Sequence, residues 1–414
     1  MISKYSCGNG VRVIHEKMPY VRSVAIGIWV KAGSAFEKDE EWGLSHFIEH
    51  MLFKGTPTRT ARMIAEQFDR IGGDINAYTS KELTCYTTTV LDNHAEEAME
   101  ILADMFFHSV FDEKEMQREK TVILDEIASV EDTPDDDVDE RLWSVMYPEH
   151  PIGRSIGGVK ATINRFDKDM IRKYMDEHYT PRNIVISVAG NYDDRLIDTI
   201  AKHFGTFEKS PIEIEQKESA PVFHGGSTIK RKEIEQAHIC LAYPGLPLKD
   251  DHLYDLILLD SIVGGTMSSR LFQEIREERG LAYSVYSYYS SYLSTGSFVI
   301  YGGTSPEHLE EMVSMMDSII GELIDKGVSA RELTNAKEQL KGSFLLGLES
   351  SESRMHRNGN NELIIGEHRT IDEVVALIDN VNINDVNKMA QTIFSCERAV
   401  SIISPYDQES ESLN

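Results

Sequence analysis

Three short segments in the first half of the chain have counterparts in the second half at a nearly constant spacing. The offset is about 214 to 217 residues for the pairs that begin at Glu96 and Glu310, at Glu115 and Glu332, and at Asp169 and Asp385. A constant offset over separate segments indicates one structural unit that occurs twice in tandem. We therefore predict two similar domains rather than one large core.

The local patterns predict mixed α and β structure. Apolar and polar residues alternate over 23–30 and 87–91, as in strands, whereas 93–107 carries apolar residues at helical spacing. At the N-terminus, Asn9-Gly10 separates two short alternating runs and predicts a hairpin turn. These patterns indicate an α+β fold.

A polar stretch with two prolines and a closing Gly225-Gly226 pair divides the chain of 414 residues nearly in half. Such composition is typical of an interdomain linker. We predict an N-terminal domain over 1–210, a linker over 211–226 and a C-terminal domain over 227–414.

Charge limits the partners of this chain. Lys and Arg number 42 against 69 Asp and Glu, which gives a net charge of -27. A surface of that sign repels nucleic acid and anionic membranes, so we expect neither as a partner. The acidity is more typical of a solvated surface that aids solubility, and the alternative is a substrate chamber that attracts basic peptides.

Four cysteines lie far apart, without the spacing of a disulfide framework or a cysteine zinc site, which favours a reducing compartment. We find no signal peptide and no run of about 18 apolar residues. The expected location is the cytoplasm.

The motif His46-Phe-Ile-Glu49-His50 carries the strongest chemical signal. Residues four apart lie on one face of a helix, so His46 and His50 can offer two imidazole nitrogens to one metal ion. Zinc suits imidazole ligands, and a catalytic zinc keeps a fourth position open for water, whose proton Glu49 is placed to take. Chance occurrence and histidines that only satisfy hydrogen bonds are the alternatives.

A third ligand is required, and the best candidate lies in the amphipathic segment 121–130, where the acidic residues Asp125 and Glu126 interrupt the apolar positions. Glu119 lies seven residues before Glu126 on the same helical face, so one of the two can ligate while the other orients a histidine or assists proton transfer. The same segment also fits a surface helix with solvated acids.

The chain resembles the M16 family of zinc metallopeptidases, and most of all its short processing-peptidase branch of about 400 residues. Residues 46–56 resemble the family's zinc helix and its exit, and Glu126 and Glu119 match the third ligand and the supporting glutamate. The resemblance and the repeat together imply two tandem α/β-sandwich domains, each with a mostly antiparallel sheet and helices on one face.

The resemblance also implies residues that contact the substrate. Asn76 and Ala77 match the strand that binds an extended peptide backbone, and Arg276 and Tyr283 match an Arg-Tyr pair that completes the active site. From the pattern alone, any tyrosine of the aromatic run 283–292 fits plain packing. In longer members the zinc half and the Arg-Tyr half close as a clam shell, so a short chain with both implies a homodimer with shared sites.

We therefore predict a zinc endopeptidase that cleaves extended peptides or unfolded segments in a closed chamber. One zinc ion per chain is expected, with cobalt or manganese as alternatives. The rival function is a non-catalytic scaffold or peptide-binding subunit of the same fold. Such proteins lose ligands, whereas all the residues named above are present here.

Overall fold

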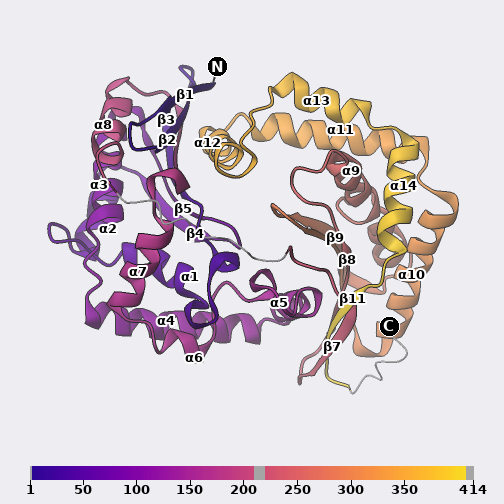
Figure 1. Ribbon diagram of the computed structural model, residues 1–414. Helices are drawn as coiled ribbons and strands as arrows, with labels where there is room; N and C mark the ends of the chain where they lie inside the picture. The colour runs from indigo at the N-terminus through magenta and orange to yellow at the C-terminus, as the bar shows by residue number, and fades with distance from the viewer. Residues whose placement is uncertain (1, 209–219, 407–414) are drawn as a thin grey trace. The chain divides into compact units, whose positions relative to one another are not determined.

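The computed structural model of the protein describes residues 2–208 and 220–406 and contains two compact units (Figure 1). The first unit comprises Met1–Ile127, Arg154–Lys217 and Leu346–His368, and the second comprises Ala128–Gly153, Glu218–Leu345 and Arg369–Asn414. Most of the predicted linker, 211–226, lies outside the described residues, so its boundaries stay a prediction. Each unit also includes a segment from the opposite half of the chain.

The first unit is built on a six-stranded sheet with the strand order β1-β2-β6-β3-β5-β4. Neighbouring strands are antiparallel except β2 and β6, which run parallel. The strands are β1 (Ile2–Ser6), β2 (Arg12–Lys17), β3 (Ser23–Val30), β4 (Asp74–Thr79), β5 (Thr84–Leu91) and β6 (Ile184–Gly190).

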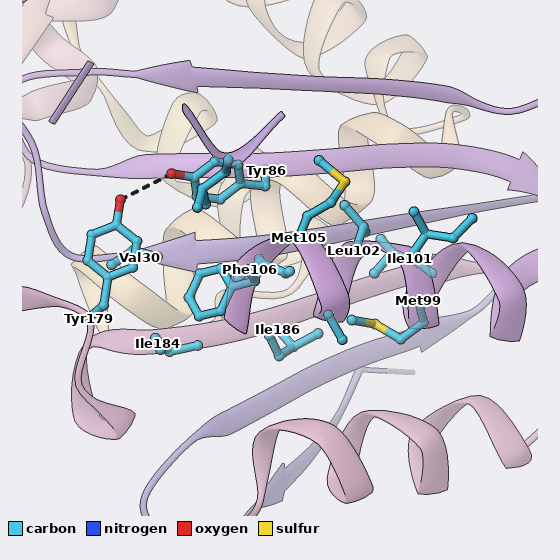
Figure 2. Packing of buried hydrophobic residues seen from close by; sticks show 14 of the residues in the cluster. Val30, Tyr86, Met99, Ile101, Leu102, Met105, Phe106, Tyr179, Ile184 and Ile186 are labelled. Atoms are coloured by element: carbon cyan, nitrogen blue, oxygen red, sulfur yellow. Dashed lines mark hydrogen bonds between the residues drawn. The ribbon is translucent and has the colours of Figure 1, made fainter. Parts of the chain in front are cut away.

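Apolar side chains on one face of this sheet form the core of the first unit. Alternate residues of β3, such as Ile26 and Ile28, point into it, and helix α3 covers them. Figure 2 shows Phe106 of α3 packed beside Tyr86 and Tyr179, whose hydroxyl groups lie 3.1 Å apart. The helices of this unit are α1 (Leu44–Leu52), α2 (Ala61–Arg70), α3 (Ala95–His108), α4 (Glu113–Asp132), α6 (Lys160–Ile163), α7 (Lys168–His178), α8 (Arg195–Phe204) and α12 (Ser351–Asn360).

The second unit repeats this plan. Its sheet has the order β7-β11-β8-β10-β9, again with one parallel pair, β7 and β11. The strands are β7 (Gly226–Arg231), β8 (Ala237–Pro244), β9 (Ala282–Ser291), β10 (Gly296–Thr304) and β11 (Ala399–Ser404), and the helices are α5 (Pro134–Met146), α9 (Leu253–Val263), α10 (Leu309–Lys326), α11 (Ala330–Gly347), α13 (Ile371–Asn380) and α14 (Ile383–Phe394).

The two strand orders correspond one to one from β2 and β7 onward, which confirms the predicted duplication. The three repeated sequence segments also fall in corresponding helices: α3 and α10, α4 and α11, and α7 and α14. The predicted fold of two tandem α/β domains with mostly antiparallel sheets is therefore confirmed. The strand predicted at 23–30 coincides with β3, and Gly10 has the positive φ of a hairpin turn, +104°.

Two helices are exchanged between the halves of the chain. A helix from the first half lies on the second sheet, and a helix from the second half lies on the first sheet. α5 follows α4 in the chain and contacts β7, β8 and β11, whereas α12 follows α11 and contacts β2, β3 and β6. α12 lies on the face of the first sheet opposite the core, against Gly27 and Trp29 of β3. Each sheet therefore has most of its helices on one face and one exchanged helix on the other.

No helix in the described part of the chain is both long enough and apolar enough to cross a lipid bilayer.

Candidate metal centre

Helix α1 brings the two motif histidines together. His46 and His50 lie one turn apart, and their Nε2 atoms are 3.2 Å apart. The helix begins after Gly43, whose φ of +93° is left-handed, and ends at Leu52 before the Lys54-Gly55 turn. The helix predicted for the motif is therefore present, and it ends at the predicted turn.

Glu126 on α4 completes a cluster of three side chains that could hold a metal ion. Its Oε2 atom lies 3.8 Å from Nε2 of His46 and 3.6 Å from Nε2 of His50. Ligand atoms about 2.0 to 2.2 Å from a tetrahedral zinc lie roughly 3.3 to 3.6 Å apart, so the observed spacing fits such an ion. The donor set of two imidazoles and one carboxylate also suits zinc.

The protonation state of His46 supports the same fit. Burial and the neighbouring His50 lower the pKa of His46 to about 4, so its imidazole is neutral near pH 7. Metal ligation needs the neutral imidazole with its lone pair free. The Nδ1 atom of His46 is buried and has no hydrogen-bond partner among the described residues.

Glu119 lies between His50 and Lys54 and contacts both side chains. Its Oε2 atom lies 3.1 Å from Nδ1 of His50, and its Oε1 atom lies 2.7 Å from Nζ of Lys54. A hydrogen bond from Nδ1–H leaves the Nε2 lone pair of His50 directed toward the metal position. Lys54 was not predicted; the only sequence signal for it is its place at the helix exit.

Glu49 lies beside the cluster with one oxygen held in place. Thr79 on β4 donates a hydrogen bond of 2.6 Å from its hydroxyl to Oε2 of Glu49. Burial raises the pKa of Glu49, and Thr79 and His50 oppose that shift. A raised proton affinity suits a general base that must accept a proton and later release it. Thr79 was also missed, because nothing in its local pattern distinguishes it from other strand threonines.

The predicted substrate strand is β4, an outer strand of the first sheet. It pairs with β5 on one side, and no described strand pairs with its other side. Ala77 donates its N–H to the side-chain oxygen of Asn76 at 2.8 Å. An unpaired strand edge of this kind can add an extended peptide.

Arg276 and Tyr283 belong to the second unit. The guanidinium carbon of Arg276 lies 4.8 Å from the ring centre of Tyr283, within cation–π range, and Tyr283 is 79% exposed. Arg276 lies in the π-helical turn Phe272–Glu278, and Tyr283 lies at the start of β9. The two predicted residues are thus neighbours, and their role stays a prediction.

Two family models and several related sequences match this chain. Residues 12–160 match the family model described as insulinase, peptidase family M16, and residues 165–340 match that of the peptidase M16 inactive domain. An uncharacterized zinc protease of Bacillus subtilis is 49% identical over 405 residues, covering 98% of each chain. A second, from Rickettsia felis, is 40% identical over 402 residues, covering 96% of each.

Two crystal structures share the fold. A protease from Helicobacter pylori superposes with a TM-score of 0.90 at 19% identity, over 98% of this chain and 99% of that one. A peptidase M16 inactive domain from Pseudomonas fluorescens superposes with a TM-score of 0.91 at 20% identity, over 99% of each chain.

Proposed function

Because the chain belongs to peptidase family M16, we propose that it is a zinc-dependent endopeptidase. The observation that carries this proposal is the convergence of His46, His50 and Glu126 beside Glu49. The relatives named as zinc proteases support zinc as the metal. Loss of ligands, which is typical of non-catalytic relatives, has not occurred in this cluster.

His46, His50 and Glu126 would hold the zinc ion, which would supply a Lewis acid for a peptide carbonyl and for the attacking water. Glu49 accepts the proton of the attacking water and delivers it to the leaving amine. Thr79 holds the Glu49 carboxylate in position, and Glu119 fixes the orientation of His50.

The substrate is an extended peptide or an unfolded segment. It adds to the free edge of β4, beside Asn76 and Ala77, where pairing with the backbone tolerates many sequences. Arg276 and Tyr283 contribute hydrogen-bond donors to the substrate carbonyl and to the developing oxyanion.

Metal content and cleavage of a quenched fluorescent peptide test the activity directly. Cleavage should stop with a chelator and return with zinc, and cobalt and manganese are compared in the same assay. Glu49→Gln should retain zinc and lose roughly 100- to 10,000-fold in kcat. Glu66→Gln, in an exposed ion pair on α2, is the matched control. Undiminished cleavage by Glu49→Gln excludes the assigned base.

We also infer that the protein acts as a homodimer that encloses its substrate in a chamber. Each copy lends Arg276 and Tyr283 to the metal centre of the other. Size-exclusion chromatography with light scattering gives the mass, and a mixture of Glu49→Gln with Arg276→Ala tests the sharing. Random pairing should restore about a quarter of wild-type activity from two inactive variants. A fully active monomer, or no recovery on mixing, contradicts the shared site.

A reducing compartment, the cytoplasm, is part of the proposal, because all four cysteines are free thiols. Fractionation of the native cells, followed by detection of the protein, tests this location.

A further inference from the structure

Glu37 is a buried carboxylate that binds the backbone at the start of α1. Only 1% of the Glu37 surface is exposed to solvent. Oε2 accepts a hydrogen bond of 2.8 Å from the N–H of Gly43, and Oε1 accepts one of 2.7 Å from the N–H of Ser45. Both oxygens therefore hold the first turn of the helix that carries the metal motif.

The start of α1 has no cap of its own. Gly43 occupies the N-cap position and has no side chain to accept a hydrogen bond from the helix. A larger residue is excluded there, because φ is +93° and an added Cβ would lie 2.7 Å from the Cα of Gly158. Glu37 supplies the acceptor that a capping Ser or Asp normally provides, and its charge suits the positive end of the helix dipole.

This cap holds the backbone directly before His46. Ser45 directly precedes His46, and its hydroxyl group lies 2.7 Å from that of Tyr174, in the core. His50 is oriented by Glu119, whereas Nδ1 of His46 has no hydrogen-bond partner among the described residues. The placement of the His46 ring consequently depends on its backbone and on packing.

We propose that Glu37 is a positioning residue of the metal centre, which holds the first turn of α1 so that His46 meets His50 and Glu126. This inference rests on the proposed zinc function. Glu37 touches neither metal nor substrate, so it acts through the backbone of Gly43 and Ser45.

Zinc affinity is the direct measurement, made by competition with a chromophoric chelator at about pH 8. In Glu37→Gln the side-chain NH2 group faces a backbone N–H, so one of the two hydrogen bonds is lost and two donors oppose each other. Zinc should bind roughly tenfold more weakly or worse, as when residues that support metal ligands are removed. The absorption spectrum of bound cobalt should also change, because the geometry of the ligands relaxes.

Glu41→Gln is the matched control. Glu41 is a buried glutamate in the same segment, but it accepts hydrogen bonds from the backbone N–H and the Nζ of Lys38 and not from α1. Its substitution should leave the zinc affinity at the wild-type value. Circular dichroism of the metal-free proteins establishes that each variant is folded before titration.

Weaker zinc binding by folded Glu37→Gln, with Glu41→Gln unchanged, supports the inference, and wild-type affinity in folded Glu37→Gln overturns it. If Glu37→Gln fails to fold, Glu37→Asp replaces it, because one methylene less prevents the carboxylate from reaching both amides; here too, weaker zinc binding supports the role and wild-type affinity overturns it. Failure of both variants to fold assigns Glu37 to the fold as a whole and overturns the specific role. Wild-type protein that binds no zinc refutes the proposed function itself.

Discussion

Glu119 shows how one buried carboxylate connects the metal centre to the protein around it. It binds Nδ1 of His50 with one oxygen and the ammonium group of Lys54 with the other. A buried carboxylate without partners is costly, and here two cationic or donor groups offset that cost. The orientation of the His50 imidazole therefore depends on a lysine outside the candidate metal centre.

Glu37 should make the stability of the protein depend on pH. Burial raises the pKa of Glu37 from 4.5 to about 7, with a smaller contribution from Glu41, and the amides of Ser45 and Gly43 oppose the shift. The hydroxyl group of Tyr174 faces the same turn. The pKa of Glu37 is higher in the folded protein than in the unfolded chain. Its contribution to folding stability is therefore full below about pH 4.5 and is lost as pH rises through about 7.

The stability of the wild type relative to Glu37→Gln should accordingly fall by on the order of 3 kcal/mol across that window. Urea unfolding of both zinc-free proteins at about pH 5 and about pH 8 measures the difference. Parallel pH profiles for the two proteins would falsify the assignment. The charge of Glu37 thus costs stability near neutral pH.

The sequence allowed the cluster of His46, His50 and Glu126 to be predicted because four-residue spacing fixes two side chains on one helix face. Glu37, Lys54 and Thr79 could not be found in that way. Each is a single polar residue whose partner is a backbone amide or a side chain distant in sequence, so no local periodicity marks it.

At the scale of elements, α12 is held to the first sheet by close packing and by a few polar contacts. Gly359 of α12 lies directly on the indole ring of Trp29. Glu16 on β2 accepts a hydrogen bond of 3.0 Å from the side chain of Asn358 and forms an ion pair with Arg354. Ser187 on β6 donates to a backbone carbonyl of the same helix.

Gly359→Ala should destabilise the first unit. The new Cβ would lie 2.2 Å from Nε1 of Trp29, a ring that is itself buried, so helix and sheet must separate. Overpacking of this kind costs about 1 to 3 kcal/mol, which exceeds the gain of at most about 1 kcal/mol from replacing a helical glycine. Urea unfolding measures the change.

Gly342→Ala on α11 is the matched control, because a Cβ there meets nothing within 4 Å. It should leave stability unchanged or raise it by up to about 1 kcal/mol. Equal effects of the two substitutions would show that α12 does not lie as tightly against β3 as described.

The elements with a local apolar pattern were predictable, whereas the exchange of α5 and α12 was not. Alternation over 23–30 indicates a strand, and helical spacing over 93–107 indicates a helix, because both patterns are local. Helix α12 carries a single apolar side chain, Met355, so its sequence does not mark it as a helix that covers a sheet. Its partners Trp29 and Glu16 lie more than 300 residues earlier in the chain.

At the scale of the whole molecule, the exchange makes each half of the chain incomplete without the other. The first sheet needs α12 from the second half, and the second sheet needs α5, whose Asp137 binds Lys230 of β7 at 2.6 Å. A division at the predicted linker over 211–226 therefore separates each sheet from one of its covering helices.

Residues 1–210 and 227–414 expressed separately should be poorly folded, and they should assemble when expressed together. Size-exclusion chromatography and circular dichroism of each fragment and of the pair measure this. Intact protein cleaved at an engineered site within 211–226 after folding is the control, and it should stay associated. Stable, cooperatively unfolding fragments on their own would contradict the interdependence.

Exchange of α12 also affects the order of events during synthesis on the ribosome. The outer face of the first sheet stays uncovered until the segment ending at Ile365 has been translated, although Trp29 on that face is made near the start. At roughly 5 to 20 residues per second, the nascent chain exposes this surface for tens of seconds. We therefore expect the growing polypeptide to depend on chaperones that bind exposed apolar strands, and translational pauses before residue 365 to lower its yield.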